Sequence, residues 1–281
     1  LKFFSNLVSG DFELANKISV LLSSNSKKNN LYYLPKHILN IKENKFYQDF
    51  DIFKKNNVSS SLNSLTPLID LWIQNKQKKT DSKLNNDYQK ISLYELLILE
   101  NFHNPESLKK IASKIYDREN LNSNDLLLLA GFFFRLADFE RFRNIIRTKL
   151  SNQFDKEYII KHFSSDNNIF YKTPTLQTIL ASKIYNNSIL NNIENDKSNL
   201  HQKILLEISL YLCPELDIAK YSLAELYNLE KTNKIAMEKL KAITSNSFFF
   251  LPSNLKKLSI VKSLNIKNDY KNLLFKYKKK W

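Results

Sequence analysis

Apolar residues recur along this chain at intervals of three and four, the spacing that places side chains on one face of an α-helix. Polar clusters at 23–30, 76–86, 164–168 and 191–199 interrupt this pattern and predict turns or longer loops. We expect about fifteen helices, mostly of ~11–15 residues. The pattern predicts an all-α fold.

Four of the prolines stand where helices are expected to begin. The tripeptide Asn104-Pro105-Glu106 combines an N-cap residue, a first-turn proline and an acidic first turn, and it predicts a helix that runs to about Tyr116. Three further segments carry the same kind of signal: Thr173-Pro174, Cys213-Pro214-Glu215 and Pro252-Ser253.

The segment from Asp217 to Ile243 has the clearest pattern of two paired helices. Small and large apolar residues share one seam, with Leu223, Ala224 and Tyr227 on the first expected helix and Ala236, Leu240 and Ile243 on the second. The alanines let the two helices approach closely, while the larger side chains fill the seam. An α-helical hairpin is predicted here.

Weaker copies of this hairpin occur elsewhere in the chain. They are centred on Leu68-Ile69 with Trp72, Leu96-Leu97 with Glu100, Leu129-Ala130 with Phe133, and Leu180-Ala181 with Ile184, and Gly10 followed by Ala15 matches the turn and contact near the start. Successive leucines are 28, 33 and 51 residues apart, against a tetratricopeptide period of about 34. The longest interval predicts an additional helix around Lys156 to Phe163.

With these motifs, the chain resembles the divergent tetratricopeptide repeat proteins common in alphaproteobacteria. The resemblance is best over 197–252 and fair over 65–75, and the family's tight-turn glycine is replaced by Lys231 in one copy and by Asn104 in another. The resemblance implies a right-handed superhelical α-solenoid of antiparallel helix pairs, with the first helices lining a concave side, and a role as a protein-binding scaffold. An irregular helical bundle is the alternative, because any amphipathic helix repeats apolar residues at three and four.

We expect a single repeat array over 1–281, with units at roughly 1–58, 59–90, 91–120, 121–163, 172–214, 215–250 and 251–281. The last expected helix, Asp269 to Trp281, places Tyr270, Leu273, Leu274 and Tyr277 on it without a polar capping helix after it. Solenoids need such caps, so further repeats are expected to follow in the native protein.

Composition narrows the choice of fold and leaves two kinds of partner open. The 43% hydrophobic and 12% aromatic residues exclude wholesale disorder, and only two glycines argue against β and doubly wound α/β folds. The net charge of +15 is typical of an AT-rich genome, in which Lys, Asn and Ile are abundant together. The alternative function is nucleic-acid binding, with candidate contacts at Lys54-Lys55, Lys76 to Lys79, Lys256-Lys257, Lys276 to Lys280 and Trp281.

A catalytic function is not expected. No phosphate-cradling loop, nucleophile elbow or zinc-like spacing occurs, so we predict no enzyme, no cofactor and no metal. We expect His37, His103, His162 and His201 at the surface or in turns, and Cys213 as a small residue at a helix end. No apolar run reaches the ~20 residues of a membrane span. The single cysteine is compatible with a reducing compartment, and we favour the cytoplasm over the periplasm.

Positions on the first helix of each pair that face away from the second helix define a candidate peptide groove. These residues are Tyr94, Asn101, Phe134, Tyr185, Tyr221, Glu225 and Asn228. Tyrosines and amides grip an extended peptide by ring contacts and hydrogen bonds. The triplets Phe132–Phe134 and Phe248–Phe250 cannot place all their rings on one seam, and burial against the next repeat is the favoured explanation.

Overall fold

The computed structural model describes residues 2–23, 34–43, 45, 64–77, 91–118, 121–165, 168–194 and 199–264, and every regular element in these ranges is helical. The first helices are α1 (Lys2–Ser9), α2 (Phe12–Ser23), α3 (Leu34–Lys42) and α6 (Thr66–Gln77). The middle of the chain forms α7 (Leu93–Leu99), α8 (Pro105–Arg118), α9 (Ser123–Arg135), α10 (Phe139–Asn144), the π-helix η2 (Ile145–Lys149) and α11 (Lys156–His162). The last described helices are α12 (Leu176–Glu194), α13 (Asn199–Leu212), α14 (Asp217–Leu229), α15 (Asn233–Lys241) and α16 (Phe250–Ser263). The all-α prediction is confirmed for the described residues.

Most helix starts fall at or near the predicted signals. Helix α8 begins at Pro105, where the side-chain carbonyl of Asn104 accepts the N–H of Glu106 at 3.0 Å. Helices α12 and α14 begin two or three residues after their prolines, and α16 begins two residues before Pro252. The additional helix expected before the third copy is present as α11.

Three helical hairpins share one turn, at Gly10, Ala137 and Lys231. These residues have φ angles of 79°, 55° and 61°, in the left-handed region. At each turn the next residue donates its N–H to the carbonyl five residues back, at 2.9, 2.9 and 2.8 Å. This is the Schellman arrangement, which glycine adopts without strain and other residues only at a cost. Lys231 therefore occupies the left-handed turn position where the tight-turn glycine was expected.

The seam between α14 and α15 is packed as the sequence predicts. Leu223, Ala224, Ala236 and Leu240 are fully buried, and Tyr227 is 8% exposed. The two alanines leave room for the close approach of the helices. The prediction of an α-helical hairpin is confirmed at this place.

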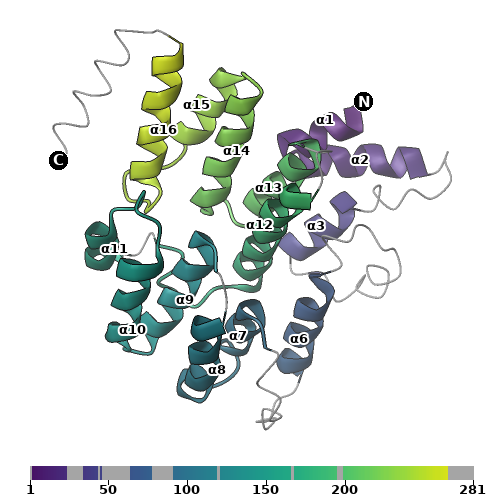
Figure 1. The fold of residues 1–281 in the computed structure, drawn as a ribbon. Helices are drawn as coiled ribbons and strands as arrows, with labels where there is room; N and C mark the ends of the chain where they lie inside the picture. The colour runs from purple at the N-terminus through teal and green to yellow at the C-terminus, as the bar shows by residue number, and fades with distance from the viewer. Residues whose placement is uncertain are drawn as a thin grey trace.

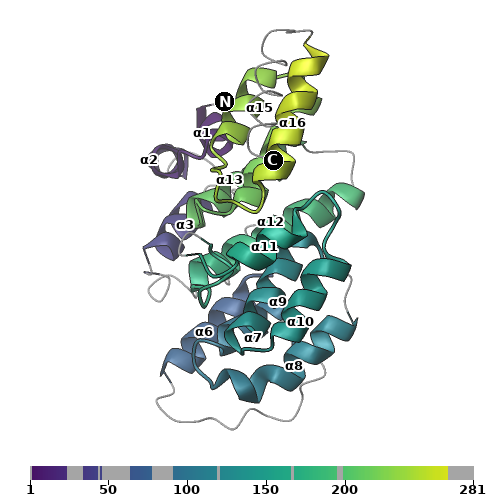
Figure 2. The same ribbon diagram turned by 90° about the vertical axis from the view of Figure 1, so that its left-hand side faces the viewer.

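Helices pack mainly against their neighbours in the chain, and α12 and α13 run through the middle of the molecule (Figure 1). The group α14–α16 lies at one end and the group α7–α10 at the other, which gives an elongated shape (Figure 2). Contacts between distant segments are also present, because α1 and α3 pack on α13, and α7 packs on α12. A stack in which each repeat touches only the next would lack the contacts of α1 and α3 with α13.

One expectation about histidine is wrong. His37 is 4% exposed in α3 and lies among the buried residues of that helix, whereas we expected a surface or turn position. Cys213 directly follows α13 and is buried, as a small helix-end residue should be. Within the described residues, no helix combines the length and the apolar character that crossing a bilayer requires.

Candidate functional site

Two of the predicted groove residues, Tyr94 and Tyr185, are buried instead of exposed. They are 4% and 6% exposed. The hydroxyl of Tyr94 donates to the carboxylate of Asp125 at 2.6 Å. The pKa of Tyr94 is raised well above its ordinary value, mainly because the residue is buried and also because the Asp125 carboxylate is close. Burial also raises the pKa of Tyr185 to about 12. A peptide cannot reach either ring, so both residues leave the candidate groove.

Side-chain hydrogen bonds join the helices α7, α9 and α12 around Asp125. The second carboxylate oxygen of Asp125 accepts from the amide of Asn186 at 3.1 Å, and the amide of Asn122 donates to Asn186 at 2.5 Å. Tyr94 completes this group from α7. Tyr94, which was expected to face a groove, therefore faces α12, and its hydroxyl helps to hold α7, α9 and α12 together.

Polar side chains also connect α14 with α16, and these contacts are more open to solvent. Tyr221 lies one turn before Glu225 on α14, and Glu225 accepts a hydrogen bond from Lys256 of α16 at 3.3 Å, with its side chain 42% exposed. The pKa of Tyr221 is raised to about 12, mainly because the hydroxyl is partly buried and also because the Glu225 carboxylate is close. Asn228 is half-buried one turn further along α14. Of the predicted set, these three residues and the exposed Asn101 remain accessible.

Asn101 and Phe134 are both engaged with the loop that precedes α12. The amide of Asn101 donates to the backbone carbonyl of Pro174 at 3.1 Å. The ring of Phe134 is half-buried among four aromatic rings, those of Phe139, Phe142, Phe163 and Tyr171. Phe134 therefore belongs to the packing of α9 against its neighbours, and we remove it from the candidate groove.

Both phenylalanine triplets are largely buried, as favoured from the sequence. Phe132 and Phe133 are fully buried, and Phe248 and Phe249 are 6% and 3% exposed. The ring of Phe248 stacks near Phe163 and Phe170, at 5.7 and 6.4 Å between centroids. The second triplet thus anchors the loop between α15 and α16 to the segment that follows α11.

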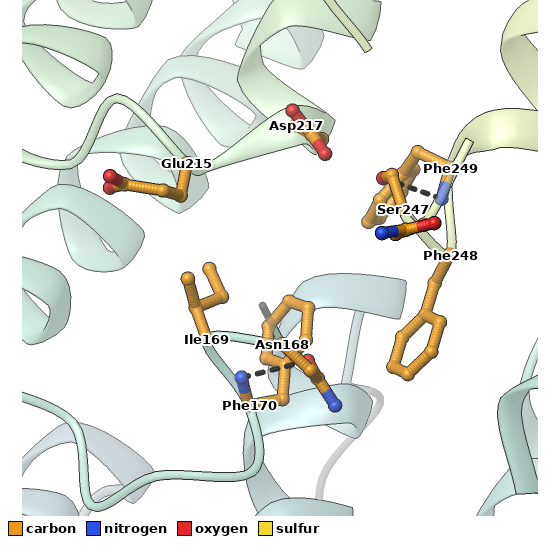
Figure 3. A pocket seen from close by; sticks show the side chains of 9 residues that line it. Asn168, Ile169, Phe170, Glu215, Asp217, Ser247, Phe248 and Phe249 are labelled. Carbon is orange, nitrogen blue, oxygen red and sulfur yellow. Dashed lines mark hydrogen bonds between the residues drawn. The ribbon is translucent and has the colours of Figure 1, made fainter. Parts of the chain in front are cut away.

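A polar hollow opens beside these rings, between three chain segments. Its walls are residues 168–172 before α12, residues 214–220 at the start of α14, and residues 244–249 before α16 (Figure 3). The larger part holds about 570 Å³ and is lined by Asn168, Ile169, Lys172, Pro214, Glu215, Asp217, Lys220, Thr244, Asn246 and Ser247. Phe170, Phe248 and Phe249 form the wall of a smaller adjoining part. We call this the three-loop hollow.

The first wall of the three-loop hollow is fixed by two residues one turn apart on α9. The guanidinium of Arg135 donates to the carbonyls of Phe170 and Lys172 at 2.8 and 3.1 Å, while its other nitrogens bind both carboxylate oxygens of Glu100. Gly131 lies under the same backbone, and a Cβ added there would stand 2.0 Å from the carbonyl oxygen of Phe170. Glycine is required at 131 because the loop lies directly on the helix.

Each of the three walls also has short-range polar contacts of its own. The Ser247 hydroxyl accepts the N–H of Phe249 at 3.1 Å, and the Asn168 side chain accepts the N–H of Phe170 at 3.0 Å (Figure 3). Asp217 pairs with Lys220 at 2.6 Å, so their charges compensate each other. Glu215 and Lys172 are exposed and of opposite sign. The hollow therefore offers both charges and amide groups around an aromatic wall.

Sequence reasoning missed this hollow. The polar cluster 164–168 predicts a turn there and the prolines at 174 and 214 predict helix starts, but neither kind of signal tells which loops meet in space. The contacts that place the first wall come from Arg135 and Gly131 on α9, 35 and 39 residues before Phe170.

The basic residues proposed for nucleic-acid binding are only partly described. Lys256 pairs with Glu225, and Lys257 is 8% exposed with its ammonium 3.2 Å from the side-chain oxygen of Asn254. Lys76 lies in the last turn of α6. Lys54-Lys55, positions 78 and 79, and 276–281 lie outside the described residues. Of the proposed contacts, Lys256 and Lys257 of α16 are thus engaged within the protein.

The described histidines form no metal site, and Cys213 is not a reactive nucleophile. In the described part of the chain, no three His, Cys, Asp or Glu side chains gather closely enough to hold a metal ion. Burial, and to a smaller extent the Glu215 carboxylate, raises the pKa of the Cys213 thiol to about 11, which keeps it in the unreactive thiol form at neutral pH.

Comparison with protein-family models, with curated proteins and with solved structures finds no match to this chain.

Proposed function

We propose that this protein is a non-catalytic helical-repeat scaffold that binds a polypeptide segment of a partner protein in the three-loop hollow. Loops held on a rigid helical framework are the usual carriers of binding function. The observation that carries the proposal is the fixation of residues 170–172 by Arg135 and Gly131, because it builds an open polar hollow of about 570 Å³ in advance of any ligand. A preformed wall lowers the ordering cost of binding.

The repeat architecture belongs to the same proposal. The equal turns at Gly10, Ala137 and Lys231 support antiparallel helix pairs, and the array that we propose from them follows a right-handed superhelical course of the tetratricopeptide kind, with the contacts of α1 and α3 on α13 added to it. In such an array the side-chain contacts of α7, α9, α12, α14 and α16 mark the first helices of successive pairs. Tyr221, Glu225 and Asn228 then extend the binding surface from the hollow along α14.

The chemistry of the hollow favours a peptide of mixed polarity. Exposed Lys172 and Glu215 can pair with charges of either sign, and Asn246 can bind a backbone amide. The half-buried side chain of Ile169 gives the larger part of the hollow an apolar contact for one side chain of the peptide. Such a site orders an extended segment through several weak contacts.

The experiment fills the hollow and compares it with an equal change elsewhere. Proteins captured by the full chain are identified by mass spectrometry, and the peptide region that binds is then synthesised and titrated by fluorescence anisotropy. Asn246→Trp, inside the hollow, should weaken binding at least tenfold, whereas Gln153→Trp, exposed in the loop before α11, should leave it unchanged. Equal affinities of the two variants would exclude the hollow as the binding site. A dissociation constant that rises steeply with salt and a captured nucleic acid would favour the alternative function.

A further inference from the structure

A second hollow lies beside the three-loop hollow, between α11 and the start of α16. It holds about 290 Å³ and is lined mainly by the half-buried Tyr158, Phe250 and Leu251 and by the buried Phe248. An apolar cavity of about 150 Å³ is already large enough for a benzene ring, so this hollow has room for a whole aromatic side chain. We call it the ring-lined hollow. The further helix expected over 269–281 lies outside the described residues.

One loop forms the common wall of the two hollows. Thr244 and Asn246 line the three-loop hollow, Ser245 lines the ring-lined hollow, and Ser247 lines both. Phe248, the next residue, lines the ring-lined hollow and the smaller part of the three-loop hollow (Figure 3). Because neighbouring residues of this loop line different hollows, the two hollows are separated by a single thickness of polypeptide.

The common wall is held in place by α11 and by the loop before it. The Tyr158 hydroxyl donates to the carbonyl of Ser245 at 3.3 Å. The ring of Phe249 meets the ring of Phe154 edge to face, at 5.1 Å between centroids. These contacts within the protein fix the wall in advance of any ligand, which lowers the ordering cost of binding on either side of it.

The two hollows differ in chemistry and complement each other. The three-loop hollow is lined by charges, amides and hydroxyls, which orient a bound segment but bury little apolar surface. Most of the affinity of an interface comes from a few large side chains, above all Trp, Tyr and Arg, that fill desolvated pockets. The ring-lined hollow provides such a pocket directly beside the polar site.

We propose that the ring-lined hollow takes one aromatic side chain of the same polypeptide segment that binds in the three-loop hollow. This proposal rests on the function proposed above and adds a feature that the partner must have. Neighbouring extended chains lie about 5 Å apart, so a segment that crosses the common wall moves by about 10 Å, or about three residues at 3.3 Å each. The partner segment therefore carries a Trp, Tyr or Phe about three residues from the part that lies in the three-loop hollow.

The size of the ring-lined hollow favours a peptide side chain over a second copy of the protein. A stable dimer buries about 800 Å² on each partner, whereas this hollow encloses a single side chain. A peptide that already lies in the three-loop hollow needs only one more contact to fill it, because the second contact is then intramolecular.

A phage-displayed library of random twelve-residue peptides is the probe. Peptides selected on the full chain should share an aromatic residue, and their consensus is synthesised, labelled and titrated by fluorescence anisotropy. Ser245→Trp fills the ring-lined hollow from its rim, where the serine side chain is exposed, and should weaken binding at least tenfold. Ser259→Trp is the matched control and should leave the affinity unchanged, since Ser259 is exposed on α16 and lines neither hollow.

Alanine in place of the aromatic residue of the peptide separates this proposal from the proposed function. It should weaken binding to the wild-type chain at least tenfold and binding to Ser245→Trp less than twofold, because that hollow no longer takes the ring. An equal loss on both proteins, or selected peptides without an aromatic residue that Asn246→Trp still blocks, would overturn the aromatic contact and leave the proposed function standing. Failure to select any peptide, or equal binding to the wild-type chain and Asn246→Trp, would overturn both. A dimeric mass in light scattering that Ser245→Trp abolishes would show a second copy in the hollow and would overturn the proposal.

Discussion

Arg135 is the residue whose removal should do most damage to the three-loop hollow and to stability together. Its guanidinium binds Glu100 through two nitrogens, at 2.6 and 2.8 Å, and the Glu100 side chain is only 1% exposed. Removing one partner of a buried ion pair leaves an uncompensated charge and costs about 3–5 kcal/mol. Arg135→Ala also removes the donors to the carbonyls of Phe170 and Lys172. We expect Arg135→Ala to lower the free energy of unfolding by about 3–5 kcal/mol.

Urea denaturation followed by circular dichroism measures this change, with Arg147→Ala as the matched control. Arg147 pairs with Glu157 at 3.1 Å, but both side chains are more than half exposed, so its loss should cost less than about 1 kcal/mol. Arg135→Lys keeps the positive charge but loses the bidentate hydrogen bonds to Glu100, so its loss of unfolding free energy should lie between those of Arg135→Ala and Arg147→Ala. If Arg135→Ala costs no more than Arg147→Ala, the guanidinium does not hold the wall of the hollow, and our account of its construction is wrong.

Three further outcomes follow from the turns, a cap and the cysteine. Lys231→Gly should stabilise the protein by about 0.5–1 kcal/mol. The left-handed conformation costs an L-residue about 1–2 kcal/mol, and the greater conformational entropy of glycine in the unfolded chain offsets part of the gain. A lower melting temperature of the variant would contradict this expectation. The pKa of Asp138 is lowered, because the backbone N–H of Arg141 and the Lys109 ammonium outweigh the desolvation of the carboxylate. The charge of Asp138 therefore stabilises the fold above pH 3.8. In urea titrations, the excess stability of the protein over the Asp138→Asn variant should vanish as the pH falls below that value. Cys213 should resist a disulfide reagent at about pH 8 in the folded protein and react at once in denaturant, because burial raises its pKa; rapid labelling of the folded chain would argue against a buried thiol.

Local signals in the sequence were enough to predict the helices and the best hairpin. The seam of α14 and α15 depends on residues within 27 positions of one another, and the helix at Pro105 depends on three adjacent residues. Both follow from helix geometry and capping, which act over a few residues. The replaced turn glycine at Lys231 was also visible, and its φ of 61° shows the strain that the replacement leaves.

Positions that depend on distant helices could not be predicted. The offset from a seam leucine places Tyr94 on a particular side of α7 but does not reveal that α12 packs on that helix. Tyr185 is buried for a similar reason, because α12 lies in the middle of the molecule. His37 is buried because α3 packs on α13. Burial of a polar residue is decided by the tertiary arrangement, which short-range periodicity does not contain.

The packing of the first helices on α13 has a consequence for biosynthesis. The ammonium of Lys42 donates to the carbonyl of Leu212, 170 residues later, and the rings of Phe12 and Tyr211 meet at 4.9 Å between centroids. Helices α1 to α3 leave the ribosome long before the surface they rest on has been translated. Their apolar sides stay uncovered until α13 has been translated, and the nascent chain is exposed to aggregation over that interval.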